Sequence, residues 1–142
     1  MEMGMKTNAF ALLALCAFAG FSASAVAGEK VRSDVQVAIN STLVSANGAI
    51  GSGRNSLDNS QRIGCQLRAV ASSATLSGSC DATDAFGNRA FCITSSPQLI
   101  EVIKAVGTDS YISFTYVPSA TTNPSCSSIS ISNSSIYEPK KP

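Results

Sequence analysis

The chain has no histidine and no tryptophan, and only 6% of its 142 residues are aromatic and 13% charged. Without histidine, neither a Ser-His-Asp triad, a Cys-His pair nor a histidine-based metal site can form. Serine is abundant, but its only candidate activating bases are lysines such as Lys104, which lies on the polar side of a predicted helix. A solvated lysine is the favoured interpretation. We therefore expect no enzyme activity, no metal and no cofactor.

The carboxylates give no stronger indication of chemistry. No two Asp or Glu residues stand in an apolar setting that would raise the pKa of one of them, as a glycosidase requires. Asp81, Asp84 and Asn88 offer oxygen atoms that calcium accepts, but the dense alternation and the terminal glutamate of an EF-hand loop are missing. Solvated turn residues are the favoured interpretation of this group.

A glycine-rich passage at residues 48–56 (GAIGSGRNS) superficially resembles a phosphate-binding loop. That motif needs a lysine after the last glycine, followed directly by serine or threonine, because these groups hold the phosphates and Mg²⁺. Here Arg54 replaces the lysine and Asn55 displaces the hydroxyl by one position. We interpret the passage as a flexible loop.

The first 27 residues have the order of charge, apolar run and small residues that is typical of a signal peptide. Lys6 precedes an uninterrupted apolar run of 13 residues at 9–21, and the A-x-A sequence at 25–27 follows. A run of this length is too short to span a bilayer, which needs about 20 apolar residues. Cys16 follows a leucine instead of a small residue and is not expected to carry a lipid. The sequence predicts cleavage before Gly28 and a protein that is secreted, periplasmic or displayed at the cell surface.

The remaining residues are nearly neutral and contain no second long apolar run. Of ten Lys or Arg and nine Asp or Glu in the chain, Lys6 and Glu2 lie in the predicted signal, which leaves nine and eight and a net charge of +1. This balance argues against nucleic acid as a partner. We expect no integral membrane segment after cleavage and an unknown protein or glycan as partner, with a homo-oligomer or filament as a further option.

An even number of cysteines in a small exported domain indicates a disulfide framework. The four that remain after cleavage are Cys65, Cys80, Cys92 and Cys126. Tight turns place Cys80 opposite Cys65 on one neighbouring strand and opposite Cys92 on the other, so Cys65 and Cys92 lie too far apart to bond. Two pairings remain, 65–80 with 92–126 and 80–92 with 65–126. The first is preferred, because a barrel of the type considered below brings Cys92 near Cys126.

Serine, threonine, asparagine and glycine dominate the predicted mature chain, which favours short strands and turns. Alternating or β-branched segments predict an edge strand followed by five further strands: 31–42, 62–71, 75–82, 89–94, 111–117 and 126–137. A turn is expected at 84–88. The aromatic residues Tyr111, Phe114, Tyr116 and Tyr137 fall on strands, where packing is their default role.

One helix is predicted at residues 97–106. Ser96 is available as N-cap and Pro97 stands at the first helical position. An apolar stripe follows at i, i+3, i+4 and i+7, formed by Leu99, Val102, Ile103 and Val106. The predicted fold is mainly β: a small disulfide-stapled barrel or sandwich with one helix. A five-stranded OB-type barrel (β-β-β-α-β-β) with an extra N-terminal strand is one candidate, and an open α+β sheet is another.

The domain organisation and function follow from these features. We divide the chain into a signal peptide (1–27), an N-terminal strand and glycine-rich segment (28–56), a disulfide-bonded β-rich domain (57–138) and a tail (139–142). The predicted function is non-catalytic recognition of glycan, protein or peptide, with Arg54, Arg62, Arg68 and Arg89 among the candidate contact residues. The alternative is a structural subunit of a surface appendage, in which residues 31–39 complete a neighbour's sheet.

Overall fold

The computed structural model describes residues 28, 30–120, 123–139 and 141, so the predicted signal peptide at 1–27 lies outside the described residues. The described residues form seven strands and two short helices. In chain order these are β1 (Gln36–Ile39), β2 (Val44–Ala49), α1 (Ile50–Arg54), β3 (Arg62–Arg68), β4 (Ser77–Thr83), β5 (Arg89–Thr94), α2 (Pro97–Ile103), β6 (Tyr111–Tyr116) and β7 (Cys126–Ser132).

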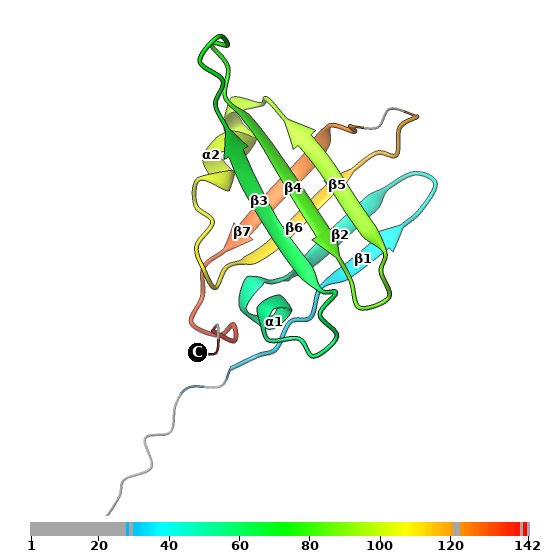
Figure 1. Cartoon of the computed structure of the whole chain (residues 1–142), viewed down its shortest axis with the longest axis vertical. Coiled ribbons are helices and arrows are strands. Elements are labelled where there is room, and N and C mark those ends of the chain that lie inside the picture. Colours follow the sequence, from blue (N-terminus) through cyan, green and yellow to red (C-terminus); the bar gives the residue numbers. More distant parts are fainter. Residues whose placement is uncertain (1–27, 29, 121–122, 140, 142) are drawn as a thin grey trace, which may run out of the picture.

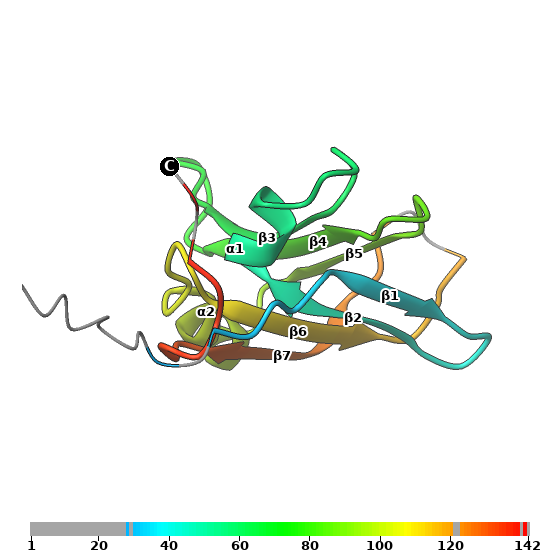
Figure 2. The ribbon, with the colours of Figure 1, turned by 90° about the horizontal axis from the view of Figure 1, so that it is seen from below.

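The strands form two antiparallel sheets, one with the order β1-β2-β6-β7 and one with the order β3-β4-β5. The sheets lie as two layers (Figure 2), and their strands cross at a steep angle (Figure 1). The mainly β class with two disulfides is confirmed. The closed barrel is wrong, because the β1–β2 hairpin occupies the place beside β6. Among the described residues, the only backbone pairing between β5 and the segment that leads into β7 is the isolated bridge of Ile93 with Ser125.

Side chains of both sheets meet in one core between the layers. Ile112 and Phe114 of β6 and Cys80 and Cys92 of the three-stranded sheet are fully buried. Alternation along each strand produces this arrangement, because successive side chains of a strand point to opposite faces. Burial of one large apolar side chain contributes about 1.5–3 kcal/mol, so the central position of Phe114 makes it a principal source of stability.

Helix α2 begins at Pro97, as predicted, but ends at Ile103 instead of residue 106. Ser96 occupies the N-cap position, although its side chain makes no capping hydrogen bond. Of the predicted stripe, Ile103 is buried, while three members are only partly buried against the core: Leu99, Val102 and Val106. Ile100, which the stripe omits, is buried as well. The buried face is therefore rotated slightly toward Ile100.

The prediction of a flexible loop at residues 48–56 is wrong. Gly48 ends strand β2 together with Ala49, and α1 follows directly with Gly51, Ser52 and Gly53 buried. The glycines permit close approach of the backbone: a Cβ on Gly51 would lie 2.0 Å from the Glu138 carbonyl oxygen, and one on Gly48 would lie 2.8 Å from Val35 Cα. The glycines are therefore explained by close packing of the backbone and not by a flexible loop.

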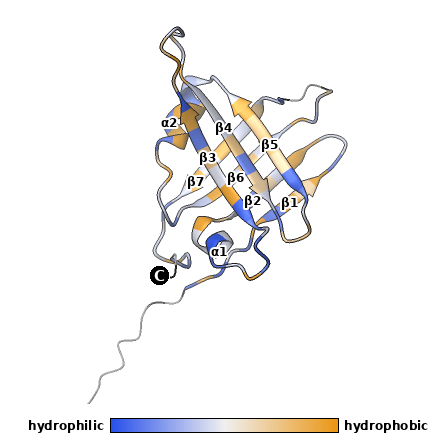
Figure 3. Cartoon of the chain, in the orientation of Figure 1, coloured by the Kyte–Doolittle hydropathy of each residue, from blue (hydrophilic) through white to orange (hydrophobic). Residues whose placement is uncertain are grey.

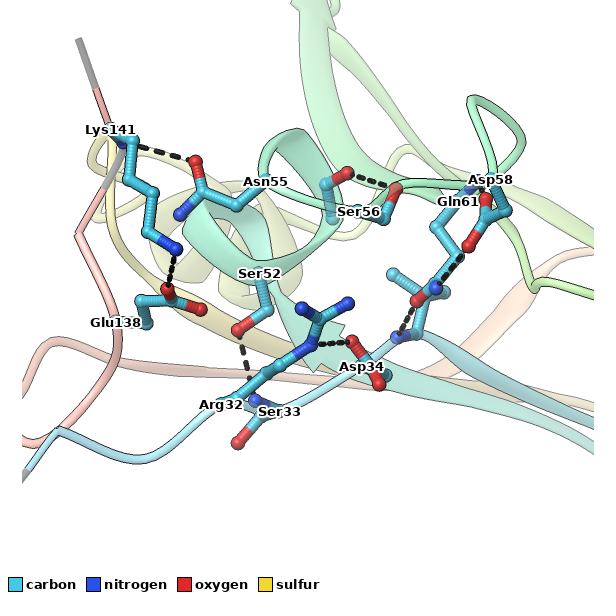
Figure 4. Close-up of polar contacts among 12 residues, drawn as sticks. Arg32, Ser33, Asp34, Ser52, Asn55, Ser56, Asp58, Gln61, Glu138 and Lys141 are labelled. Atoms are coloured by element: carbon cyan, nitrogen blue, oxygen red, sulfur yellow. Dashed lines mark hydrogen bonds and ion pairs between the residues drawn. The ribbon is translucent and has the colours of Figure 1, made fainter.

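Polar contacts fix α1 between the N-terminal segment and the C-terminal residues (Figure 4). The Ser33 amide donates to Ser52 Oγ at 2.9 Å, and the Lys141 amide donates to Asn55 Oδ1 at 3.0 Å. Val31 forms an isolated parallel bridge with Tyr137. The segment from residue 31 thus packs on its own chain, and the strand at its end, β1, pairs with β2 in the register Gln36–Asn47.

The predicted strands at the two ends of the chain are shorter in the structure. The N-terminal segment at 31–42 contains strand β1 only at Gln36–Ile39, although the preceding Val35 is 3% exposed and belongs to the core. Strand β7 ends at Ser132 instead of residue 137. The chain after β7 returns to the N-terminal segment, where the Ile136 carbonyl oxygen accepts a hydrogen bond from the Val31 amide. Residues before and after position 57 contribute to the same core.

The two disulfides have the preferred pairing. Cys65 lies directly opposite Cys80 in the β3–β4 ladder, with a Cα–Cα distance of 4.0 Å. Cys92 and Cys126 join β5 to β7, with a Cα–Cα distance of 5.0 Å. The first bond therefore lies within one sheet, whereas the second connects the two layers. The barrel neighbours that suggested the second bond are absent, and it forms because the sheets approach each other at β5 and β7.

Candidate binding site

The outer face of the three-stranded sheet carries the most distinctive group of exposed side chains. Cys80 and Ala82 of β4 and Ala90 and Cys92 of β5 point inward and are buried. Alternation then directs the residues between them outward. We define the arginine face as the outward side chains Arg62, Gln66, Arg68, Asp81, Arg89, Phe91 and Ile93. These residues are neighbours in the register of β3, β4 and β5.

Three arginines and one carboxylate set the charge of this face. Arg62 Nε lies 3.3 Å from Asp81 Oδ2, and both side chains are about half exposed, so the pair contributes only about 0.2–1 kcal/mol to stability. Arg68 and Arg89 are exposed and have no ion-pair partner among the described residues. Figure 3 shows the hydrophilic ends of β3 and the hydrophilic start of β5 where the three arginines lie.

Two large apolar side chains lie among the arginines. Phe91 is 37% exposed and Ile93 is 38% exposed, although both belong to a strand with a fully buried cysteine. Beside them is a shallow hollow of about 430 Å³, whose lining includes Gln66, Arg68 and Ser79. The face thus combines guanidinium groups, hydroxyl and amide groups, and apolar surface. Such a mixture suits recognition of another molecule more than bond-breaking chemistry.

The other candidate cations lie elsewhere. Arg54 is at the end of α1, where its Nη1 donates to the Thr108 carbonyl oxygen at 3.4 Å. Lys104 follows α2 and forms an exposed ion pair with Glu101 at 2.6 Å. The four arginines named from the sequence therefore divide into three on the arginine face and one, Arg54, at the end of α1.

The strand aromatics have structural roles. Phe114 is fully buried, and Tyr116 is 9% exposed with its hydroxyl oxygen accepting from the Phe91 amide at 3.5 Å. The rings of Tyr111 and Tyr137 stack with centroids 5.1 Å apart and join the C-terminal residues to β6. Packing, the default interpretation, accounts for these aromatic side chains.

The carboxylate of Asp84 is buried and holds the turn between β4 and β5. Its oxygens accept from the Phe86 amide at 2.9 Å and from both the amide and the side chain of Asn88 at 2.9 Å each. Burial alone would raise the pKa of Asp84, but these hydrogen bonds and one from the Val37 amide outweigh it and lower the pKa. Since Asp81 pairs with Arg62, the two aspartates do not converge on one site. No group of three metal-ligating side chains occurs in the described part of the chain.

Comparison of the chain with family models, with curated proteins and with solved structures found no match. In the ranges that the structure describes, no helix is long and apolar enough to cross a membrane.

Sequence reasoning missed the outward position of Phe91 and Ile93. A signal was present, because a disulfide directs Cys92 inward and its two neighbours in a strand must then point outward. The same parity would have placed Arg89 on that face. Arg62 and Arg68 share the face by the same parity relative to Cys65, which the predicted turns place opposite Cys80.

Proposed function

We propose that this protein is an exported, non-catalytic binding module that recognises an acidic protein surface through the arginine face. The observation that carries the proposal is the grouping of Arg62, Arg68 and Arg89 around the exposed side chains of Phe91 and Ile93. Arginine and aromatic residues are enriched in the centres of protein interfaces, where lysine is depleted. Export is supported by the two disulfides, which persist in oxidising compartments.

A protein surface is favoured over a glycan because apolar area and cationic groups occur together on the face. The test is capture of partners from the native medium by the wild-type protein and by the variant Arg68→Glu/Phe91→Ser. The matched control is Lys104→Glu, which changes the charge on α2 outside the face. We expect capture to be lost in the first variant and kept in the control, with unfolding free energies unchanged within about 1 kcal/mol.

Two results would contradict this assignment. Partners captured equally by the face variant would show that recognition uses another surface. Elution of every partner by a sulfated polysaccharide such as heparin, with no protein specific to the wild type, would indicate an anionic glycan as ligand.

A structural subunit of a surface appendage is the second candidate function. It is favoured by the position of β1 at the edge of its sheet, where exchange between copies is easiest. However, exchange would have to extract Val35 from the core and break the hydrogen bond from its amide to Gln61 Oε1 at 2.7 Å. Light scattering after size-exclusion chromatography discriminates the two functions: a monomer supports the binding module, whereas an open-ended polymer supports the appendage subunit.

A further inference from the structure

The backbone groups of β3 that face away from β4 can be identified from the hydrogen-bond pattern. The turn at the end of β4 is closed by the Asp84 amide, which donates to the Asn88 carbonyl oxygen at 3.1 Å. Hydrogen-bonded and non-hydrogen-bonded residue pairs alternate along an antiparallel ladder. The main chains of Cys80 and Cys92 therefore hydrogen-bond to each other, and those of Asp81 and Ser79 hydrogen-bond to β3.

The same alternation fixes the direction of the amides of β3. Gly64 and Gln66 are the residues of β3 that bond with Asp81 and Ser79. The amides and carbonyls of Ile63, Cys65 and Leu67 therefore point to the outer side of β3, away from β4. No hydrogen bond to these three amides is formed within the described residues. This side of the sheet is an open edge.

On β5 and on the side of β1, specific groups meet the outward amides. On β5, the Ile93 amide donates to the Pro124 carbonyl oxygen at 2.9 Å, and the Phe91 amide points to the Tyr116 hydroxyl. On the side of β1, the Val35 amide donates to Gln61 Oε1 and the Val37 amide to the Asp84 carboxylate. Helix α2 packs against β7, whose outward amides at Ile129 and Ile131 also have no hydrogen bond within the described residues. An uncovered edge is usually blocked in this way because it is a template for another strand.

A cleft of about 480 Å³ runs beside the open edge of β3. One side is β3 from Arg62 to Cys65, and the opposite side is formed by α1 and the segment from Val106 to Thr108. Figure 1 shows this segment, between α2 and β6, passing on the free side of β3. The side chains of Ile50, Ile63 and Val106 give the cleft an apolar lining. A backbone with unpaired donors thus stands beside an apolar recess.

The charge around the cleft selects the kind of segment that fits. Arg54 and Arg62 line it, and none of the aspartates and glutamates that the structure describes does. Arg62 is compensated by Asp81 at 3.3 Å, whereas the partner of Arg54 is the neutral carbonyl of Thr108. A carboxylate on the occupant would meet the Arg54 guanidinium, and a lysine or arginine would be repelled.

We propose that β3 binds an extended, acidic peptide segment of a partner protein by strand addition. The main chain of the peptide pairs with the outward amides and carbonyls of Ile63, Cys65 and Leu67. One apolar side chain enters the cleft above Ile63, and a neighbouring carboxylate binds Arg54. Hydrogen bonds between main chains supply affinity in this mode, and alternate side chains supply specificity. The cleft shares Arg62 with the arginine face but no residue with the hollow beside Phe91, so either assignment can fail without the other.

The test uses protein produced from the full chain by export, so that both disulfides form, and labelled with ¹⁵N. The probe is a nine-residue peptide of alternating glutamate and valine with blocked ends, titrated at low salt. We expect the amide signals of Ile63, Cys65 and Leu67 to shift and to become protected from exchange. Arg54→Glu should weaken binding about tenfold. The matched control Lys104→Glu, which is outside the cleft, should leave binding within about twofold of the wild type.

Two altered peptides test the pairing itself. The same peptide with lysine in place of glutamate should bind at least about tenfold more weakly. N-methylation of the alternate amides that face β3 should abolish binding, because the main-chain donors are lost, whereas N-methylation of the other set should be tolerated.

Four results of the peptide experiments would overturn the proposal. These are shifts centred on Phe91 and Arg89, equal binding of the lysine peptide, tolerance of both methylated peptides, and no shift at millimolar peptide. Protection of the β3 amides that rises with protein concentration in the absence of peptide would identify a second copy of this chain as the occupant and would also overturn it.

Discussion

The two edge strands of the three-stranded sheet differ in what meets their outward backbone groups. On β5, the Ile93 amide bonds to Pro124 and the Phe91 amide points to the Tyr116 hydroxyl. On β3, the corresponding amides have no hydrogen bond within the described residues and face a cleft. The same sheet therefore has one closed and one open edge, although the two strands have similar lengths.

The disulfides follow the same division. Cys92–Cys126 ties β5 to the opposite sheet, whereas Cys65–Cys80 ties β3 only to its own neighbour β4. Strand β3 is thus fixed in the sheet without being covered on its outer side. The difference teaches that a small domain can stabilise an edge strand and still leave its backbone available, because covalent attachment does not use hydrogen-bonding groups.

The largest expected effect separates the two disulfides. Replacing Cys92 and Cys126 with alanine opens a loop of 34 residues and should lower the free energy of unfolding by about 4 kcal/mol on the chain-entropy estimate. Replacing Cys65 and Cys80 opens a loop of 15 residues and should cost about 3 kcal/mol. Urea unfolding followed by fluorescence measures both. A larger loss of unfolding free energy on removing Cys65–Cys80 than on removing Cys92–Cys126 would contradict the view that the bond between the sheets is the stronger constraint.

Helix α2 closes the sandwich near β3, and its anchor is Ile103. A Cβ on Gly78 of β4 would lie 2.6 Å from Ile103 Cδ1, which shows how closely this side chain packs on the sheet. Ile103→Ala should lower the unfolding free energy by about 2–5 kcal/mol, as measured by thermal or urea unfolding. Glu101→Ala, on the exposed side of α2, should cost less than about 1 kcal/mol. Equal costs would mean that α2 is not anchored by this side chain.

The contact that closes the side of β1, between the Val37 amide and the Asp84 carboxylate, should depend on pH. The contacts on β5 should not, because their acceptors are a carbonyl and a hydroxyl oxygen. The pKa of Asp84 is lowered in the folded protein, so its ionised form stabilises the fold above the unfolded pKa. This contribution is lost as the pH falls from about 4 downward. We expect the stability of the wild type to decline over this range more steeply than that of Asp84→Asn, which itself should cost about 1–3 kcal/mol near neutral pH. Parallel profiles of the two proteins in acid urea titrations would contradict this role.

The smallest effect concerns a single group on the closed edge. Tyr116→Phe removes the hydroxyl that accepts from the Phe91 amide at 3.5 Å and should cost about 0.5 kcal/mol. Exchange of the Phe91 amide should accelerate, while that of Ile93, which bonds to Pro124, should remain unchanged. Accelerated exchange at both amides would indicate that the whole edge depends on Tyr116.

The sequence predicted the central elements because their patterns are local. Alternation indicated β3, β4 and β5 to within a few residues, and a proline followed by an apolar stripe indicated α2. The spacing of the cysteines across turns excluded only a Cys65–Cys92 bond, and the correct choice between the two remaining pairings rested on barrel neighbours that the structure does not have. Strand β2 was not predicted, because VSANGA has small side chains and a glycine that fit only against their actual neighbours.

The two candidate binding surfaces could be predicted only in part. The composition named the arginines, but the arginine face depends on the register of three strands. The open edge of β3 depends on which groups reach each outer amide, such as the Tyr116 hydroxyl or the Pro124 carbonyl. These contacts join residues that are distant in the sequence, and no local pattern specifies them.

Hydrogen exchange of the free protein, followed by NMR, tests the contrast between the two edges most directly. We expect the outward amides of β3, those of Ile63, Cys65 and Leu67, to exchange roughly a hundredfold faster than the Ile93 amide on β5, because they have no acceptor in the described part of the chain. The amides of Gly64 and Gln66, which bond with β4, should be protected and serve as the internal control. Equal protection of the outward amides of β3 and of Ile93 in the monomer would contradict the account, since the edge of β3 would then be closed.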